Sequence, residues 1–280
     1  MNKHLFQLRK IIRNNSFAES ILKRFLNYLR LKNAREYLKE ANAYPEDFEN
    51  IIRDYKYSIK KDHRGIRQVL NLESAVRFIE ENRIEGCFVE TGTFTGGASA
   101  YALLALQRIS KNTLRDYWGF DSFEGMPVPS VEDGDESFMW LYGRKMSEIN
   151  KTTVGQLAGH EMNKADFKEC YDYLCGTGYP KGKIKLIKGW FQKTIPEKKT
   201  EIGPIAVLRL DGDFYESTLV VLNELFSQVS ENGVIIIDDY GSFSGCKKAV
   251  DSFLKGKNIR CKLLYIENGI RMLIKKTEDN

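Results

Sequence analysis

Short apolar runs that are rich in β-branched residues recur along the chain, and turn residues bound each of them. This pattern is typical of buried strands. The runs are 87–90, 117–120, 184–187, 205–211, 233–238, 263–266 and 270–274. Apolar residues at helical spacing predict helices at 98–106, 163–174, 217–229 and 243–255. The alternation predicts an α/β fold with a seven-stranded, mostly parallel sheet. Glu267-Asn268-Gly269 predicts a tight hairpin turn, so the last strand is expected to be antiparallel and to lie at the edge.

The first part of the chain predicts helices without strands. Apolar side chains three and four positions apart predict helices over 5–40. Asn14-Asn15-Ser16 interrupts this pattern, and Ser16 with Glu19 three residues later has the form of a capping box. Pro45-Glu46-Asp47 predicts the first turn of another helix, and 72–82 predicts a helix that precedes the first strand.

These patterns divide the chain into a helical N-terminal appendage, residues 1–80, and an α/β domain, residues 81–280. Residues 124–160 of the domain combine proline, glycine and acidic residues. We interpret them as an insertion over a cleft, because long loops inside a compact domain are usually lids or binding loops.

Charge is distributed unevenly along the chain. The formal net charge is +5, but residues 1–40 contain ten Lys/Arg and three Glu, a net of +7. The simplest interpretation is a solvated helical face; the alternatives are a membrane-surface helix, a basic arm that binds a partner, or attraction of a phosphorylated substrate. The basic residues lie outside the predicted domain and no aromatic-basic motif recurs, which argues against a nucleic-acid partner.

Targeting signals are not predicted. No apolar run reaches the roughly 18–20 residues of a membrane span, and no apolar segment of a secretory signal follows the basic N-terminus. The five cysteines are scattered and lack zinc-ligand spacing. Reduced thiols in a cytoplasmic protein are therefore expected.

Four acidic residues follow two of the predicted strands. Asp211 and Asp213 end the run 205–211, and Asp238 and Asp239 end the run 233–238. Acids gathered at the ends of neighbouring strands repel one another unless a cation lies among them, and carboxylates are ligands that Mg²⁺ prefers. We therefore predict a divalent metal site. Two alternatives stay open: Asp213 could cap the following helix, and Asp239 could only stabilise the next turn.

A glycine-rich turn, 91–97, joins the first predicted strand to a helix. Strand, glycine turn and helix form the first unit of a nucleotide-binding sheet, and Asp121 ends the next strand, where an acceptor for ribose hydroxyls is expected. Alternatives remain here too. Glu90 could pair with a helix N-terminus, Trp190 could be a core aromatic residue, and His63 and His160 are interpreted as structural rather than as bases.

The glycine-rich turn, Asp121 and the acidic strand ends follow one another along the chain. In this order they resemble the motifs of the macrocin O-methyltransferase family of class I S-adenosylmethionine-dependent methyltransferases. This is the group typified by the tylosin, mycinamicin and novobiocin sugar methyltransferases. The matching segments are 89–98, 121–127, 188–191, 207–218 and 233–240, and the resemblance covers about residues 50–275. It implies a Rossmann-like fold, a cytoplasmic enzyme and, because family members are often oligomeric, a homo-oligomer.

The resemblance also implies roles for individual residues. The cofactor site would comprise Glu90, Thr91, Gly92, Gly96, Asp121, Ser122, Gly189 and Trp190. The magnesium ligands would be Asp211, Asp238 and Asp239, and Asp213 would be the general base.

The function expected from the sequence is magnesium-dependent transfer of a methyl group from S-adenosylmethionine to a hydroxyl. The acceptor is expected to be a glycoside or nucleotide sugar of a natural-product or surface-polysaccharide pathway. Three alternatives stay open: a phenol or catechol O-methyltransferase, an iron enzyme, and a non-catalytic nucleotide-binding module. Scattered histidines disfavour iron, and four clustered acids disfavour a pure binding module.

Overall fold

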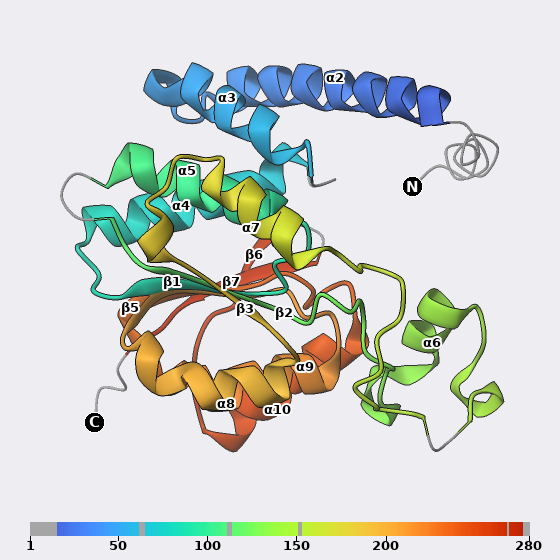
Figure 1. The fold of residues 1–280 in the computed structure, drawn as a ribbon. Coiled ribbons are helices and arrows are strands. Elements are labelled where there is room, and N and C mark those ends of the chain that lie inside the picture. Colours follow the sequence, from blue (N-terminus) through green and yellow to red (C-terminus); the bar gives the residue numbers. More distant parts are fainter. Residues whose placement is uncertain (1–15, 62–64, 111–113, 151–152, 268, 277–280) are drawn as a thin grey trace.

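The computed structural model describes residues 16–61, 65–110, 114–150, 153–267 and 269–276 (Figure 1), and the side chains from residue 22 onward. Seven strands form one sheet in the order β3-β2-β1-β4-β5-β7-β6. The strands are β1 Cys87–Thr91, β2 Tyr117–Asp121, β3 Ile184–Lys188, β4 Ile205–Leu210, β5 Val229–Ile237, β6 Leu264–Glu267 and β7 Ile270–Ile274. Strands β1 to β5 are parallel, and β7 is antiparallel to both of its neighbours. The predicted fold class is confirmed.

The position predicted for the antiparallel strand is wrong. Strand β7 lies between β5 and β6, so β6 forms the edge of the sheet. Ile270 and Leu273 of β7 are buried, whereas Tyr265 of β6 is 66% exposed. The more apolar strand of the hairpin therefore takes the inner position, because burial of apolar side chains stabilises the fold.

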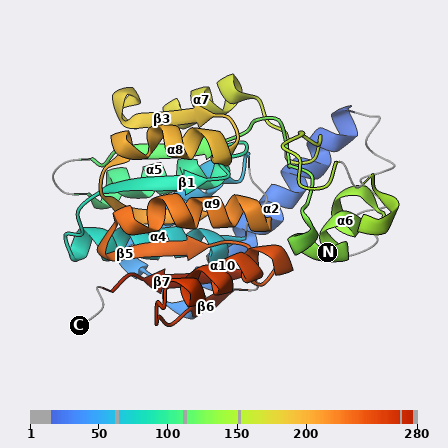
Figure 2. The ribbon, with the colours of Figure 1, turned by 90° about the horizontal axis from the view of Figure 1, so that it is seen from below.

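Helices cover both faces of the sheet. Helices α4 Ile66–Glu81, α5 Gly97–Ile109 and α7 Phe167–Cys175 lie on one face. Helices α8 Phe191–Ile202, α9 Tyr215–Leu225 and α10 Ser244–Gly256 lie on the other, as the view from below shows (Figure 2). Each layer encloses its own apolar core against the sheet. This three-layer arrangement leaves the carboxyl ends of the parallel strands open for a site.

Helix α8 was not predicted. Its sequence is rich in Lys and Glu and contains Pro196, which normally disfavours a helix interior. Only Thr194, Ile195 and Ile202 are buried on it, so no clear helical spacing of apolar residues is present. Helix α4 was predicted at 72–82 but begins at Ile66.

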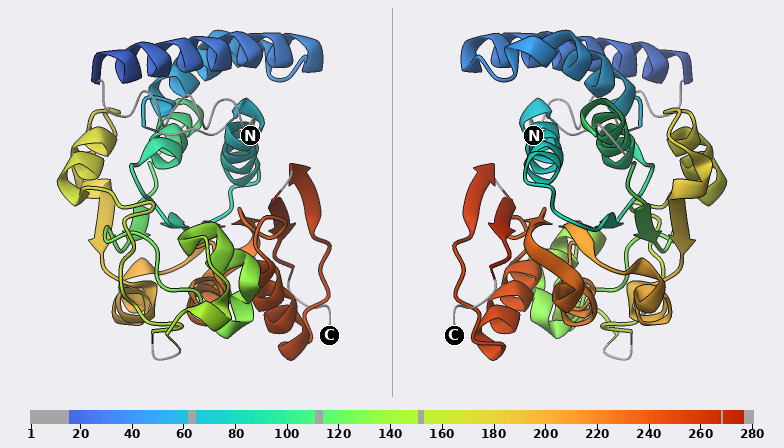
Figure 3. Two further views of the ribbon diagram at one scale, coloured as in Figure 1. Left: turned by 90° about the vertical axis from the view of Figure 1, so that its right-hand side faces the viewer. Right: turned by 90° about the vertical axis from the view of Figure 1, so that its left-hand side faces the viewer.

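Helices α2 Ser16–Ala41 and α3 Phe48–Ser58 form a further layer above α4 and α5 (Figure 3), and the short 3-10 helix η1 Pro45–Asp47 joins them. The predicted start at Pro45 is confirmed. Helix α2 begins at Ser16, and the earlier half of the predicted region 5–40 lies outside the described residues. None of the helices in the described ranges is long and apolar enough to cross a membrane.

A buried cluster of charged residues joins α3 to the domain. Arg108 of α5 donates to Glu73 of α4 at 2.7 Å and to Asp54 of α3 at 3.2 Å. Arg77 also pairs with Glu73, and its second partner is Asp47 of η1. The carboxylates of Glu73 and Asp54 are almost inaccessible to water. Their ion pairs therefore hold the appendage in one position.

Replacing Arg108 by methionine is expected to lower the free energy of unfolding by about 3 kcal/mol, because two buried carboxylates lose a shared partner. Urea denaturation measures this change. The matched control is Lys198→Met, which removes a solvent-exposed ion pair with Glu201 and is expected to cost less than about 1 kcal/mol. A loss of similar size in both variants would contradict a structural role for the buried cluster.

Residues 124–160 contain the helix α6 Gly134–Tyr142 and two short 3-10 helices, η2 Val131–Asp133 and η3 Met146–Glu148. The insertion stands beside the carboxyl ends of the strands (Figure 1). Its base is closed by a bridge in which His160 N–H donates to the carbonyl of Met126 at 2.8 Å. All five cysteines are free, and three of them are buried.

Candidate functional site

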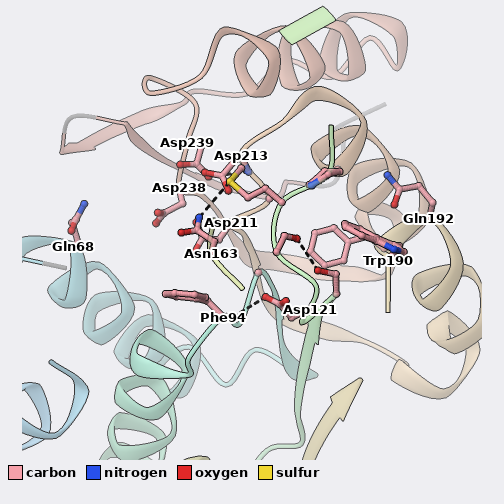
Figure 4. A pocket seen from close by; sticks show the side chains of 18 residues that line it. Gln68, Phe94, Asp121, Asn163, Trp190, Gln192, Asp211, Asp213, Asp238 and Asp239 are labelled. Carbon is pink, nitrogen blue, oxygen red and sulfur yellow. Dashed lines mark hydrogen bonds between the residues drawn. The ribbon is translucent and has the colours of Figure 1, made fainter. Parts of the chain in front are cut away.

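A cavity of about 380 Å³ lies at the carboxyl ends of the central strands. Among the residues predicted from the sequence, eight line it (Figure 4): Gly92, Asp121, Ser122, Trp190, Asp211, Asp213, Asp238 and Asp239. The other four, Glu90, Thr91, Gly96 and Gly189, are not part of its lining. Both predicted halves of the site, the glycine turn and the acidic strand ends, therefore open into one cavity.

Three carboxylates converge at one end of this cavity. Leu210 of β4 is paired with Ile237 of β5, so Asp211 and Asp238 follow on neighbouring strands. One oxygen of each of Asp211, Asp238 and Asp239 lies within 4.8 Å of the others. The predicted adjacency of the two strands is confirmed. Clustered carboxylate oxygens are a donor set that fits a hard cation such as Mg²⁺.

Arg209 lies among these acids, and sequence reasoning missed it. Its guanidinium is 2% exposed and pairs with Asp211 at 3.0 Å and Asp238 at 2.9 Å. A third pair joins it to Glu90 at 2.6 Å. The sequence does contain a signal for this role: Arg209 is a lone arginine inside an apolar run. A charge in a buried strand requires partners, so such a residue is expected to be paired.

The arginine changes the electrostatic argument. A metal ion is not the sole source of positive charge among these acids, because a fixed guanidinium already supplies one. When ionised, Glu90 and the three aspartates carry four negative charges, so one arginine leaves a surplus of three. That surplus still favours a divalent cation.

Glu90 is buried and is not part of the cavity lining. Besides Arg209, its partners are the hydroxyls of Ser99 and Tyr117, and its side chain is only 1% exposed. Burial, with Glu90 nearby, raises the pKa of Tyr117 well above its usual value, so this hydroxyl stays protonated and donates. In the structure Glu90 therefore anchors Arg209 beneath the cavity.

Asp121 is held in place by the glycine turn. Its carboxylate accepts hydrogen bonds from the backbone N–H groups of Phe94 at 2.8 Å and Phe123 at 2.7 Å. Burial raises the pKa of this carboxyl, and the two backbone donors partly offset the rise. Each carboxylate oxygen keeps further acceptor capacity, and Asp121 lines the cavity.

Gly92 connects the two halves of the site. Its φ is +91°, and a side-chain Cβ there would overlap the carbonyl oxygen of Asp211. Asp211 N–H in turn donates to the carbonyl of Thr91 at 2.9 Å. Only glycine allows this approach, so the turn and the acidic strand end are packed as one unit.

Asp213 adopts an unusual backbone conformation. Strand β4 ends at Leu210, and Asp213 has a φ of +58°. Its N–H donates to the carboxylate of Asp239 at 3.3 Å, and its side chain lines the cavity. The alternative that Asp213 caps the following helix is wrong, because α9 begins at Tyr215 with Phe214 at the N-cap position.

Asp133 is a second residue that the sequence did not reveal. It lies in η2 of the insertion, is 1% exposed, and accepts a hydrogen bond from Tyr215 N–H at 2.7 Å. It also accepts from the N–H and hydroxyl of Ser130, and a Cβ at Gly245 would overlap it. Asp133 thus ties the insertion to the first residues of α9 and α10, which follow the two acidic strand ends.

The structure describes only one of the two histidines that the sequence analysis interprets as structural, His160. His160 Nδ1 accepts from Met162 N–H at 3.1 Å and His160 is not part of the cavity lining, which is consistent with a structural role. His63 lies outside the described residues.

Comparisons with known proteins agree with this geometry. A model of the macrocin-O-methyltransferase family matches residues 5–271. Demethyldecarbamoylnovobiocin O-methyltransferase of Streptomyces niveus is 31% identical over 238 residues, which cover 81% of this chain and 84% of that protein. A second relative, from Streptomyces olivaceus, is 35% identical over 189 residues, covering 68% of this chain and 66% of that protein. It is named 8-demethyl-8-(2,3-dimethoxy-alpha-L-rhamnosyl)-tetracenomycin-C 4'-O-methyltransferase.

The fold is also similar to that of a solved structure, the O-methyltransferase NovP. The TM-score is 0.65 at 26% sequence identity, and the match covers 91% of this chain and 100% of that chain.

Proposed function

Since the chain belongs to the macrocin-O-methyltransferase family and is an S-adenosylmethionine-dependent O-methyltransferase, we propose that it methylates a hydroxyl of a sugar. The acceptor class is a small glycoside or a nucleotide sugar, in natural-product or surface-polysaccharide biosynthesis. The name of the tetracenomycin relative, which specifies the 4' oxygen and a rhamnosyl group, supports a sugar acceptor. The free cysteines support a cytoplasmic location.

The polar lining of the cavity favours a sugar over a catechol. The side-chain amides of Gln68, Asn163 and Gln192 line it together with the four aspartates. An amide both donates and accepts hydrogen bonds, which suits an acceptor with several hydroxyls. A catechol offers one pair of hydroxyls and a flat apolar ring, so it would leave these amides without ligand partners.

Residues on the glycine-turn side would hold the cofactor. When bound, S-adenosylmethionine supplies an electrophilic methyl group. The Asp121 carboxylate would accept hydrogen bonds from the ribose hydroxyls, with Ser122 beside it, and Trp190 would border the adenine. Glu90 and Thr91 would act from strand β1, where Glu90 holds Arg209, and Gly96 and Gly189 would act by fixing the shape of the turns. Gly96, at the N-cap position of α5, has a φ of +82°, and Gly189 has a φ of +140°.

Residues on the acidic side would hold a magnesium ion and move a proton. When bound, Mg²⁺ supplies positive charge that lowers the pKa of a nearby hydroxyl. Asp211, Asp238 and Asp239 would be its ligands, and their convergence within 4.8 Å is the observation that carries this proposal. Asp213, on the same side of the cavity, would take the proton of the acceptor hydroxyl.

The proposed function is tested by measuring methyl transfer with and without metal. The purified protein is incubated with S-adenosylmethionine and, in parallel, with a nucleotide-activated rhamnose, a methyl rhamnoside and catechol. We expect a methylated sugar product in mass spectra, loss of its formation after exhaustive EDTA treatment, and recovery on addition of Mg²⁺. Full activity after EDTA would contradict the metal site, and turnover of catechol alone would contradict the sugar acceptor.

A further inference from the structure

The apolar face of helix α2 changes side near the middle of the helix. In the first half, the described apolar residues are Leu22, Phe25, Leu26, Tyr28 and Leu29. Their spacing of three and four places them on one side. In the second half Leu31, Ala34 and Leu38 share a side. With about 100° of rotation per residue, the two sides point in roughly opposite directions.

Among the residues that the structure describes, the rest of the chain covers only the second of these two faces. Ala34 and Leu38 are 0% and 1% exposed and belong to the core that α3, α4 and α5 form. Phe25 and Tyr28 are 56% and 63% exposed. Figure 1 shows that the first half of α2 extends past α3, and Leu29 is also exposed. An exposed group of large apolar side chains of this kind usually marks a binding surface.

The charges around the exposed face indicate the partner. Residues 20–35 contain five Lys/Arg and no Asp or Glu. By helical position, Lys23 and Arg30 flank one side of the apolar face and Arg24 flanks the other. An apolar stripe bordered by long cationic side chains is the arrangement of a helix that lies in a membrane interface, where those side chains reach the lipid headgroups.

Other partners fit this surface less well. A second copy placed symmetrically on the same face would bring the cations Lys23 and Arg24 close to cations of the partner, and like charges repel. A nucleic acid would pair with the cations but leave Phe25 and Leu29 in water.

We propose that the first half of α2 binds the surface of an anionic lipid bilayer. Phe25, Tyr28 and Leu29 enter the interface, and the exposed Lys23 and Arg24 contact the acidic headgroups. This surface is separate from the catalytic cavity, and the proposal does not depend on the acceptor.

Vesicle co-sedimentation of the full chain tests the proposal, with phosphatidylcholine vesicles and with vesicles that also contain phosphatidylglycerol. We expect binding only to the anionic vesicles, and weaker binding as salt is raised. The double variant Phe25→Glu/Leu29→Glu is expected to bind at least about 100-fold more weakly, since each side chain contributes about tenfold or more. Lys23→Gln with Arg24→Gln is expected to weaken binding about 20–30-fold.

The matched controls are substitutions of the same kinds at positions outside α2. Val131→Glu alters an exposed apolar residue of the insertion, and Lys198→Gln removes a cation on α8, at the far face of the molecule. Both are expected to bind vesicles like the unaltered protein, and melting curves by circular dichroism establish that all variants fold. Vesicle binding that survives Phe25→Glu/Leu29→Glu would overturn the proposal. Sedimentation velocity could instead show a dimer that Phe25→Glu/Leu29→Glu abolishes, while no vesicle binding is seen. That result would assign the face to a subunit interface and would also overturn the proposal.

Discussion

Replacing Asp213 by asparagine is expected to lower kcat for methyl transfer by about 10²–10⁴-fold, the contribution typical of a general base. Asparagine keeps the shape of the side chain and tolerates a positive φ, so the turn at +58° is expected to persist. The amide, however, cannot take a proton from the acceptor. KM for S-adenosylmethionine is expected to stay unchanged, because the residues that we propose to hold the cofactor lie on the other side of the cavity.

Single-turnover experiments with saturating cofactor measure this effect on the chemical step. The pH profile gives a second readout, because the limb that reports ionisation of the base is expected to disappear in the variant. Glu216→Gln is the matched control: this exposed acid lies three residues further on and outside the cavity lining. An unchanged single-turnover rate for Asp213→Asn would remove Asp213 from the role of base.

Replacing Asp239 by asparagine is expected to weaken divalent metal binding by about 10²-fold or more and to lower methyl transfer about 10³-fold. The loss follows because a neutral amide is a poorer ligand for a hard cation, and metal assistance is worth several kcal/mol. Of the three carboxylates, Asp239 is the one whose substitution tests metal binding most directly. Arg209 pairs with Asp211 and Asp238, so replacing either of those would also break a buried ion pair.

Binding of Mn²⁺, followed by electron paramagnetic resonance, measures the metal affinity independently of turnover. Added Mg²⁺ at high concentration is expected to restore part of the activity. Glu231→Gln, on the same strand β5 but at its amino end, is the matched control and is expected to bind Mn²⁺ normally. Equal Mn²⁺ affinity in Asp239→Asn and the unaltered protein would exclude Asp239 as a ligand.

The sequence by itself determined the architecture and the location of the site. β-branched runs bounded by turn residues predicted the strands, because strands buried on both faces need continuous apolar sequence. The same runs end in Asp211 and Asp238, and parallel strands present their carboxyl ends at one edge of the sheet. The motifs around Gly92 and Asp211 also predicted the family that the comparisons support.

The helices show where local patterns fail. Helix α8 lacks apolar periodicity and contains Pro196, so its helical state depends on packing against α9 and β2 rather than on its own sequence. The order of β6 and β7 likewise depends on which strand of a hairpin buries more apolar surface.

Only the tertiary structure decided the partners of the buried charges. Because β4 lies between β1 and β5, Arg209 reaches Glu90 on one side and Asp238 on the other. Asp133 meets Tyr215 across 82 residues of sequence. Periodicity indicates which side chains are buried, but the choice of partner depends on strand order and on which loops fold over the edge. The acidic strand ends were therefore visible in the sequence, whereas the arginine that pairs with them was assigned by the fold.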